Sequence, residues 1–426
     1  MDGPAARAFQ VFPGGISNGE YGLPADDVVV MERGDGCRLW DTDGKEYLDF
    51  SMAWGSCLVG HARPEVAAAV RDQALQGSNF AYLNHQVLAA LAEETRRISP
   101  AAERLRFCAS GTEATMYCQR VARGFTGRDK ILKFEGAYHG ANETGVTSLF
   151  PSRLKDYPEP ELTSAGTPAM REHLLVAPFN DLETTGRIVA ENANNLAAVI
   201  VEPLQRCTPP KDGFLEGLRR ACDDNNVLLI FDEVVTGFRL AYGGAQEYYG
   251  VVPDLVAYGK TLGGGYPIGV FGGRVEIMEM VAEERIGGDD YVWMASTLGG
   301  NPVSAAAANA ALSVFRLPGT YDRLLSLGNY LREGMRQVLG GRQVRAQVIG
   351  DGPLAQVVFS DEPVFDYRST HRGDKRMARE TMLGLFRHRV FLNPMGTKLY
   401  LSVAHDESVV DSFLERFDAV LEKTAR

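Results

Sequence analysis

Hydrophobic positions along the chain follow two different periods. Between Val28 and Phe50, apolar and polar residues alternate in three short runs, and Asp-Gly pairs separate the runs, which is typical of antiparallel strands joined by tight turns. From about residue 64, helical patterns instead alternate with short apolar runs that we predict to be buried strands, at residues 105–108, 130–134, 197–201 and 228–231. This alternation predicts an α/β fold with a mostly parallel sheet, whose ligands bind beyond the carboxyl ends of the strands.

The C-terminal part of the chain has a mixed pattern. A helical pattern runs from about residue 305 to 339 and a final amphipathic helix begins near Asp406, with strand-like runs between them at 354–359, 390–392 and 398–402. We predict that this part forms a smaller α+β domain, which the N-terminal meander completes. The predicted division is an N-terminal meander at 1–63, a large domain at 64–310 and a small domain at 311–426.

One long segment carries no periodic pattern. Residues 148–170 contain prolines at positions 151, 158, 160 and 168. Long loops without secondary structure in compact domains are usually functional or disordered. We therefore interpret this segment as a mobile lid.

Composition narrows the class of function. The chain has 426 residues, of which 45% are hydrophobic, so it can bury a large core. Its formal net charge of -11 is spread without a long acidic or basic run, so we expect small molecules or a second copy of the chain as partners, and neither nucleic acid nor membrane. The six cysteines form no Cys-x-x-Cys pair and the N-terminus has no targeting pattern, so we expect a cytoplasmic protein with free thiols and no metal site.

Two apolar runs end on residues of opposite charge. Lys260 ends one run and is followed by glycines, and Asp232, followed by Glu233, ends another. An amine and a carboxylate at strand ends are what pyridoxal 5′-phosphate (PLP) requires, because the amine forms a Schiff base with its aldehyde and the carboxylate pairs with its pyridinium nitrogen. Each residue taken singly has another interpretation, a lysine whose amine reaches the surface and an aspartate that caps a helix.

Three turns add groups that suit the same cofactor. Ser110, Gly111 and Thr112 follow a strand and open a helix, where backbone N–H groups favour a phosphate, although an ordinary helix cap explains them equally. Tyr138 follows another strand, and its ring is suited to stacking on a planar ring or to packing in the core. Thr297, in a glycine-rich turn, offers a hydroxyl to a phosphate or to a helix cap. Their appearance in one chain, together with the acid and the lysine, favours a single cofactor site.

Together these motifs resemble those of the class III (fold type I) PLP-dependent aminotransferases, and within that family most closely those of the glutamate-1-semialdehyde aminomutases. The resemblance extends from about Phe12 to Glu422. The matching stretches are residues 110–116, 126–130, 134–140, 231–239, 259–265 with Pro267, and 299–302. The resemblance implies the fold type I architecture, a large domain with a mostly parallel sheet plus a smaller α+β domain.

The resemblance also implies a role for each matching residue. Lys260 is the Schiff-base lysine that later moves a proton between substrate and cofactor, and Asp232 pairs with the pyridinium nitrogen. Tyr138 covers the ring, and Gly111 and Thr112 hold the phosphate. The implied cofactor set is completed by Ser110, His139, Glu202, Val234 and Thr297, of which Thr297 reaches the phosphate of the neighbouring subunit in a homodimer. His139 and Glu202 have supporting structural roles as their alternative.

The residues expected to contact substrate differ from those of the aminomutases. Where the aminomutases have a serine and an arginine after a Pro-Gly-Gly turn, this chain has Asn18 and Tyr21, and Thr397 stands where they have a glutamate. Because a bidentate arginine is the best partner of a carboxylate, we expect a substrate other than glutamate 1-semialdehyde. Trp54 is interpreted as a wall of the pocket or as core, and Arg206 as an anion-binding group or a solvated loop residue.

The leading hypothesis is transfer of an amino group between two molecules. An amino donor leaves its nitrogen on the cofactor as pyridoxamine 5′-phosphate, and a carbonyl acceptor collects it. The alternative is an aminomutase, glutamate-1-semialdehyde 2,1-aminomutase or a relative, which returns the nitrogen to a neighbouring carbon of the same substrate. A third hypothesis is a PLP-binding structural or regulatory protein without turnover. The sequence does not identify the donor, the acceptor or the stereochemistry.

Overall fold

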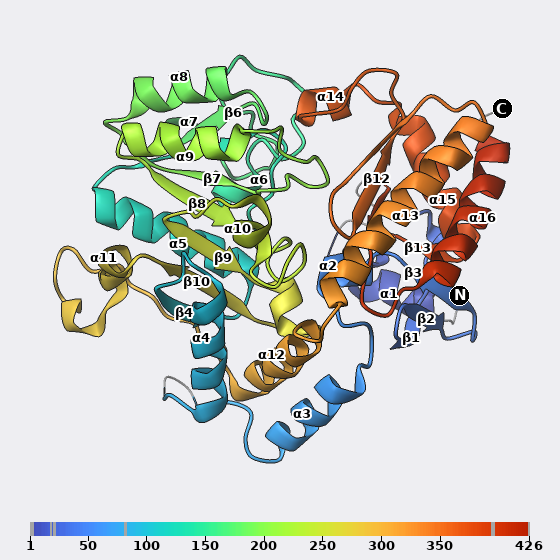
Figure 1. The fold of residues 1–426 in the computed structure, drawn as a ribbon, viewed down its shortest axis with the longest axis horizontal. Helices are drawn as coiled ribbons and strands as arrows, with labels where there is room; N and C mark the ends of the chain where they lie inside the picture. Colours follow the sequence, from blue (N-terminus) through green and yellow to red (C-terminus); the bar gives the residue numbers. More distant parts are fainter. Residues whose placement is uncertain (1–3, 18, 20–22, 81–82, 393–396, 425–426) are drawn as a thin grey trace. The chain divides into compact units, whose positions relative to one another are not determined.

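In the computed structural model, which describes residues 4–17, 19, 23–80, 83–392 and 397–424, the chain forms two units. The larger unit consists of Pro64–Tyr321 and Phe365–Arg368. The smaller unit consists of Met1–Arg63, Asp322–Val364 and Ser369–Arg426. Figure 1 labels the elements of both units.

The larger unit is built on a seven-stranded sheet with strand order β4-β10-β9-β8-β7-β5-β6. Only β10 runs antiparallel to its neighbours β4 and β9, whereas the other paired strands are parallel. The strands are β4 (Arg104–Cys108), β5 (Lys130–Phe134), β6 (Leu174–Ala177), β7 (Leu196–Val201), β8 (Leu228–Asp232), β9 (Leu255–Tyr258) and β10 (Gly269–Gly273). A mostly parallel α/β sheet was predicted, and this part of the prediction is confirmed.

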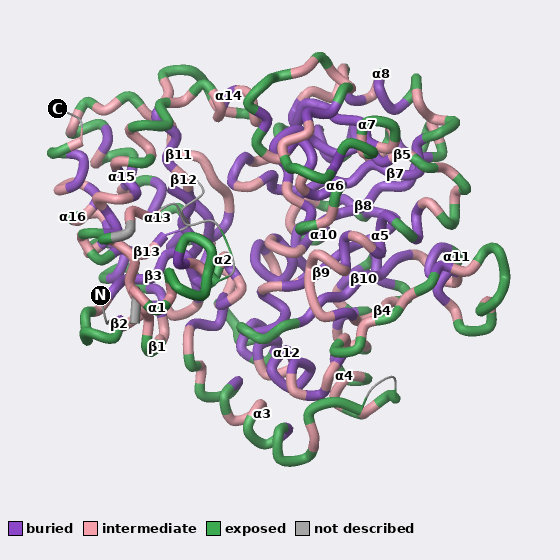
Figure 2. The backbone as a smooth tube through the Cα atoms, turned by 180° about the vertical axis from the view of Figure 1, so that it is seen from behind, coloured by how far each residue is buried: buried purple, intermediate pink, exposed green. Residues whose placement is uncertain are grey.

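Helices cover both faces of this sheet, which explains why its central strands read as continuous apolar runs. Every residue of β7 and β8 is buried, as Figure 2 shows by colour. Ile131 and Ile200 lie in one core cluster with Val121 of α5, whereas Phe134 contacts Phe214 of α9. The helices of this unit are α3 (Pro64–Ala74), α4 (Gln86–Ile98), α5 (Gly111–Thr126), α6 (Glu143–Val146), α7 (Met170–His173), α8 (Leu182–Asn192), α9 (Phe214–Asp224), α10 (Gly244–Tyr249), α11 (Val275–Met278) and α12 (Pro302–Phe315), with short 3-10 helices η3 (Lys260–Gly263), η4 (Glu279–Val281) and η5 (Glu283–Arg285).

Strands β6 and β10 were not predicted from the sequence. In β10, three of the five residues are glycine, which weakens the strand signal. The glycine at its start is required by close approach to β4, because a β-carbon on Gly269 would lie 2.1 Å from the carbonyl oxygen of Ser110. Tertiary contacts therefore stabilise a strand here, although the local sequence disfavours one.

The smaller unit contains two small sheets. The first has the order β1-β2-β3-β13, and the N-terminal meander forms its antiparallel part while β13 joins β3 in parallel. The second has the order β11-β12-β14 and is antiparallel. The strands are β1 (Met31–Asp35), β2 (Arg38–Asp41), β3 (Glu46–Asp49), β11 (Gln347–Ile349), β12 (Leu354–Val358), β13 (Val390–Phe391) and β14 (Lys398–Tyr400). The first strand was predicted from Val28 and begins at Met31.

The remaining helices include α13, which the sequence pattern had joined to α12. The segment that separates them contains Pro318, which lacks the N–H that a continuous helix needs, and Gly319 at φ +77°. The predicted boundary at residue 310 lies inside α12, which packs on α3 and η3 of the larger unit. The elements are α1 (Pro4–Val11), η1 (Pro13–Gly15), η2 (Ala25–Asp27), α2 (Met52–Gly55), α13 (Thr320–Gly341), α14 (Tyr367–His371), α15 (Lys375–Arg387) and α16 (Glu407–Thr424).

The proline-rich segment 148–170 has no helix or strand before α7. Several hydrogen bonds nevertheless tie it to the larger unit: the Tyr157 hydroxyl donates to Glu135 Oε2 at 2.7 Å, and Arg368 donates to the carbonyl of Lys155 at 2.5 Å. Its role as a mobile lid stays a prediction. Separately, no helix among the described residues has the length and apolar character needed to cross a bilayer.

Candidate active site

The carboxyl ends of the parallel strands of the larger unit bring the predicted cofactor residues to one edge of the sheet. Asp232 is the last residue of β8, and Glu202 directly follows β7. Gly259, which directly precedes Lys260, lies against Gly111, because a β-carbon at Gly259 would be 3.3 Å from the Gly111 Cα. In sheet order the edge carries Ser110, Gly111 and Thr112 after β4, Lys260 after β9, Asp232, Glu202, and Tyr138 with His139 after β5.

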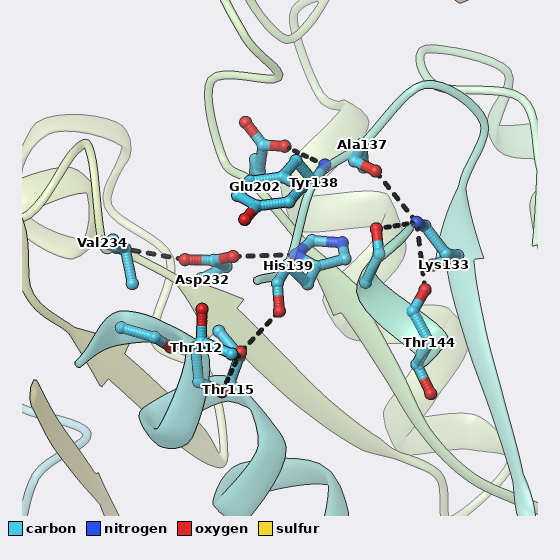
Figure 3. Close-up of polar contacts among 12 residues, drawn as sticks. Thr112, Thr115, Lys133, Ala137, Tyr138, His139, Thr144, Glu202, Asp232 and Val234 are labelled. Atoms are coloured by element: carbon cyan, nitrogen blue, oxygen red, sulfur yellow. Dashed lines mark hydrogen bonds and ion pairs between the residues drawn. The ribbon is translucent and has the colours of Figure 1, made fainter. Parts of the chain in front are cut away.

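Asp232 and His139 form the central polar contact of this edge. His139 Nδ1 lies 2.8 Å from Asp232 Oδ2, and the backbone N–H of Val234 donates to Asp232 Oδ1 at 3.1 Å (Figure 3). Both side chains are buried. The carboxylate is therefore held through both of its oxygens, in an orientation set by two different loops. His139 Nε2 is buried and has no hydrogen-bond partner in the described chain.

Lys260 is the first residue of the 3-10 helix η3, which follows β9. Strand β9 is the neighbour of β8, the strand that ends at Asp232. The backbone of Lys260 has φ +39°, an uncommon conformation for a residue other than glycine that tends to occur at functional sites. Burial of the amine lowers the pKa of Lys260 to about 8, while the charge of Asp232 acts in the opposite direction. The neutral amine, the form that a nucleophile or a base requires, is therefore far more populated at neutral pH than in an exposed lysine.

The N-terminus of α5 has the features of an anion site. Ser110 caps the helix, and its hydroxyl accepts from the N–H of Glu113 at 3.2 Å. Among the described residues, the N–H groups of Gly111 and Thr112 have no hydrogen-bond acceptor. The Thr112 hydroxyl accepts from the N–H of Ala141 at 3.3 Å, which joins this turn to the loop after β5. Free N–H groups at a helix start favour a phosphate.

Glu202 organises two further backbone segments. Its Oε1 accepts from the N–H of Tyr138 at 2.7 Å, and its Oε2 accepts from the N–H of Arg206 at 3.0 Å. Burial alone would raise the pKa of Glu202, but the charges of Arg206 and His139 and the two N–H donors together lower it. The carboxylate is thus kept ionised in a buried position, where it fixes the base of the Tyr138 loop.

Arg206 is held in a conformation that positions its guanidinium beside aromatic rings. Its φ is +61°, in the left-handed region, and its guanidinium carbon lies 5.8 Å from the ring centres of both Tyr138 and Phe150. Within the described part of the chain, the guanidinium makes no hydrogen bond or ion pair. Arg239, by contrast, is fully buried and donates to the Val235 carbonyl and the Thr261 hydroxyl, both at 3.0 Å, so it holds the loop after β8 together.

The other predicted residues are exposed, belong to the smaller unit or lie outside the described residues. Thr297 belongs to the larger unit but is exposed, and its carbonyl accepts from Asn79 at 3.2 Å. Trp54 is half-buried in the smaller unit, in a turn where Met52, Ala53 and Trp54 all have positive φ. In the same unit the Thr397 hydroxyl donates to the Val357 carbonyl at 2.7 Å. Asn18 and Tyr21 lie outside the described residues.

Two buried charged residues, Lys133 on β5 and Glu135 in the loop that follows, were not identified from the sequence. Lys133 is 0% exposed, and Glu135 accepts from Arg368 Nε at 2.8 Å and from the Tyr157 hydroxyl. The one available signal for Lys133 was a lysine inside an otherwise apolar strand run. Arg368 is distant in sequence, so no local pattern connects it with Glu135.

The residues of this edge fit PLP. They provide an amine of lowered pKa, a buried carboxylate oriented by a histidine, an aromatic ring and a helix start with free N–H groups. Within the described residues, no group of three or more histidine, cysteine or acidic side chains is arranged to hold a metal ion. The geometry therefore supports an organic, phosphate-bearing cofactor at this edge.

Comparison with known proteins gives a consistent result. The family model described as Aminotransferase class-III matches residues 22–396. A glutamate-1-semialdehyde 2,1-aminomutase of Anaeromyxobacter sp. (strain Fw109-5) is 39% identical, covering 99% of this chain and 97% of that protein. A 32% identical crystal structure, an omega-transaminase from Sphaerobacter thermophilus, superposes with a TM-score of 0.92 and covers 99% of this chain and 97% of its own.

Two further solved structures were determined with cofactor. A transaminase with PLP bound is 28% identical, with a TM-score of 0.87 and coverage of 99% of this chain and 96% of that chain. A variant of the glutamate-1-semialdehyde aminomutase from Pseudomonas aeruginosa PAO1, in complex with pyridoxamine 5′-phosphate (PMP), is 25% identical, with a TM-score of 0.83 and coverage of 93% of this chain and 88% of that chain. Both cofactor forms thus occur in proteins similar to this one.

Proposed function

This chain belongs to the class-III aminotransferase family and is a PLP-dependent enzyme, and from that premise we propose that it transfers an amino group from an amino donor to a carbonyl acceptor with Lys260 as its catalytic lysine. The observation that carries the proposal is the meeting of Lys260 and the Asp232–His139 pair at the sheet edge where α5 begins. The third hypothesis, a binding protein without turnover, gives no reason for the lowered pKa of Lys260.

The side chains divide the work of the reaction among them. Bound PLP supplies an electron-withdrawing ring that stabilises negative charge on a substrate carbon. Lys260 Nζ, partly neutral near pH 8, is suited to attack an aldehyde and later to accept and return a proton. Asp232 offers a carboxylate to hold a proton on a ring nitrogen, and His139 and Val234 fix its orientation. Gly111 and Thr112 offer N–H groups to the phosphate, with Ser110 capping the helix.

A single half-reaction tests this function. The PLP-loaded enzyme is mixed with each member of a panel of amino donors, without any acceptor, and the keto product is measured. Transamination predicts about one keto product per active site and a cofactor absorbance that reverts only when a carbonyl acceptor is added. Lys260→Ala should abolish the product, whereas Lys211→Ala, in the same unit, should not. Absence of product with every donor, while a single substrate is converted completely to an isomer, would contradict the proposal.

The second candidate is an aminomutase, and the aminomutase name of the 39% identical relative favours it. The two candidates share the lysine, the aspartate and both cofactor forms, so the edge described above supports them equally. They differ in whether a second molecule must collect the nitrogen. Glutamate 1-semialdehyde, offered alone, distinguishes them: complete conversion to an isomeric amino acid supports the mutase, and a requirement for a separate acceptor supports the transaminase.

For the substrate we place a carboxylate against Arg206. A half-buried guanidinium without an acceptor in the described chain, held beside Tyr138 by a left-handed backbone, is suited to bind an anion that the chain itself does not supply. Trp54 and Thr397, with Asn18 and Tyr21, remain our candidates for further substrate contacts from the smaller unit.

We further propose a cytoplasmic homodimer in which Thr297 reaches the phosphate of the neighbouring subunit. Thr297 is exposed, and its neighbours Trp293 and Leu298 expose 65% and 58% of their surface, as apolar side chains at an interface with another chain do. A second copy of the chain would cover these side chains. The six buried free cysteines support a reducing compartment.

A further inference from the structure

Lys133 is a buried cation whose partners are all backbone carbonyls. It lies on β5, two residues before the loop of the candidate site, and its side chain is 0% exposed. Its ammonium lies within hydrogen-bond distance of four carbonyl oxygens, which share its three N–H donors: Ala137 at 2.9 Å, Thr144 at 3.2 Å, Gly145 at 2.9 Å and Thr147 at 2.7 Å. No carboxylate is hydrogen-bonded to it among the described residues. The positive charge is therefore hydrogen-bonded only to carbonyl groups among the described residues, and the carboxylates of Glu202 and Asp232 act on it at longer range.

The four carbonyls belong to both arms of one loop. Ala137 stands where the loop leaves β5, and the other three stand in and just after α6, where the loop returns. The ammonium joins these arms, so residues 138–143 form a closed turn with Tyr138 and His139 at its base. Figure 3 shows Lys133 donating to carbonyls of both arms, next to the His139–Asp232 contact.

This arrangement needs the charged form of the lysine. An ammonium has three N–H donors, whereas a neutral amine has two and would turn its lone pair toward a carbonyl oxygen. Burial lowers the pKa of Lys133 to about 7, while the charges of Glu202 and Asp232 act in the opposite direction. Taking a charge out of water without a bonded counter-ion is unfavourable in general, and here the hydrogen bonds to the loop carbonyls offset that cost. The charge therefore serves the loop rather than the core.

We propose that Lys133 is a positioning residue, whose ammonium fixes the loop from Ala137 to Thr147 and thereby sets Tyr138 and His139 for the cofactor. The inference rests on the proposed function, in which those two side chains adjoin PLP. The loop's other contacts fit this role. The Tyr138 N–H donates to Glu202, and the carbonyl of His139 accepts from the Thr115 hydroxyl at 2.6 Å. The turn is therefore held by Lys133 and also by hydrogen bonds to residues of the candidate site.

The first test compares two buried cations that both donate to backbone carbonyls. Lys133→Met keeps an unbranched side chain, one atom shorter, and removes its charge. The matched control is Arg332→Met in the smaller unit, where Arg332 donates to the carbonyls of Gly352 and Leu354 at 2.6 and 2.7 Å. Both variants are measured as apoenzyme for Tm, and then for PLP Kd and for the visible circular dichroism of the bound cofactor.

We expect both variants to lower the Tm, because both leave carbonyls without their donors. Only Lys133→Met should also weaken PLP binding, and we expect a loss of about 10- to 100-fold, as when a residue that orients a metal ligand is removed. It should also change the circular dichroism of the cofactor, which reports how the ring is held. An unchanged PLP Kd and spectrum in Lys133→Met, or equal changes in Arg332→Met, would overturn the inference.

A second variant tests the charge directly and covers the case in which Lys133→Met does not fold. Lys133→Ala is folded and assayed with added propylammonium, which replaces the missing part of the side chain, or with propanol, which has the same chain length without the charge. Restoration of PLP affinity by propylammonium alone supports the inference, and equal effects of both additives overturn it. Failure of the proposed function would differ, because the wild-type enzyme would then bind PLP and still give no keto product with any amino donor.

Discussion

Gly111 faces the side chain of Val234 so closely that a β-carbon at Gly111 would lie 2.8 Å from both Val234 methyl carbons. This contact joins the start of α5 to the loop after β8. In that loop, the backbone N–H of Val234 also donates to the Asp232 carboxylate. The site that we assign to the phosphate and the carboxylate that we assign to the cofactor ring are thus packed directly against one another.

Gly111→Ala should therefore weaken cofactor binding. Because neither side of the contact is a flexible chain end, the helix start must move, and we expect PLP Kd to rise about tenfold, the loss of roughly one hydrogen bond to a charged group. Titration of the apoenzyme with PLP measures this. Val234→Ala removes both methyl groups and should restore affinity in the double variant.

Gly186→Ala is the matched control for this change. Gly186 lies within α8, and a β-carbon there would meet no atom within 4 Å. Alanine is favoured over glycine inside a helix by about 1 kcal/mol, so this variant should be neutral or slightly more stable. A similar loss of PLP affinity in both glycine variants would contradict the packing argument.

The reactivity of Lys260 should depend on pH with a midpoint near 8. Its folded pKa is lowered from 10.5 to about 8, so the neutral, nucleophilic fraction rises as pH increases through 8, where exposed lysines remain charged. Reductive methylation of the apoenzyme, followed by peptide mass mapping, measures the midpoint for each lysine.

The Asp232→Asn variant tests which groups set the pKa of Lys260. The Asp232 carboxylate raises the pKa of Lys260 against the effect of burial, so its removal should move the midpoint below 8. A Lys260 midpoint near 10 in the wild-type apoenzyme, or an upward movement in Asp232→Asn, would show that burial does not control this amine.

Arg206→Gln should discriminate among substrates. Loss of the guanidinium should raise KM for amino donors with a carboxylate by about 10- to 100-fold, the value of a charged hydrogen bond, and leave donors without a carboxylate unchanged. Steady-state kinetics with paired donors measure the difference. Arg153→Gln, an exposed arginine of segment 148–170, should change neither class. A uniform loss for all donors would assign Arg206 to structure instead.

Mixed dimers should reveal the subunit that supplies Thr297. Thr297→Ala and Lys260→Ala homodimers should each have low activity. If Thr297 acts across the interface, a heterodimer of the two variants contains one site with both native residues and should regain about half of the wild-type activity per dimer. If Thr297 acts within its own subunit, the heterodimer has no intact site and stays impaired. Tagged subunits separated by affinity chromatography allow this measurement.

Arg368→Met should destabilise the larger unit. Glu135 is buried, and removal of its arginine leaves a carboxylate with the Tyr157 hydroxyl as its remaining side-chain partner among the described contacts. Breaking a buried pair costs about 3 kcal/mol, which corresponds to a fall in Tm of about 5 °C. Arg345→Met breaks an exposed pair with Asp361 and should lower Tm by no more than about 2 °C. Differential scanning calorimetry of both apoenzymes tests the contrast.

Much of the fold was predictable because burial on both faces leaves a direct mark on the sequence. The strands that carry Asp232 and Glu202 are uninterrupted apolar runs, and the Asp-Gly pairs of the N-terminal meander specify its turns. Strand β10 and the break before α13 were missed, since a glycine-rich strand depends on a close neighbour and one proline divides an otherwise helical pattern.

The sequence by itself determined the class of cofactor chemistry, because Lys260, Asp232 and the turn from Ser110 to Thr112 each stand at or just beyond the end of a recognisable strand. Tertiary structure alone decided what holds those groups. The His139–Asp232 contact joins residues 93 positions apart, and Lys133 meets its four carbonyls only when the loop after β5 folds back. Likewise, Phe365–Arg368 joins the larger unit although the residues on both sides belong to the smaller one. Such contacts form only when segments distant in the sequence fold together, and the local pattern of polar and apolar residues does not show which segments will meet.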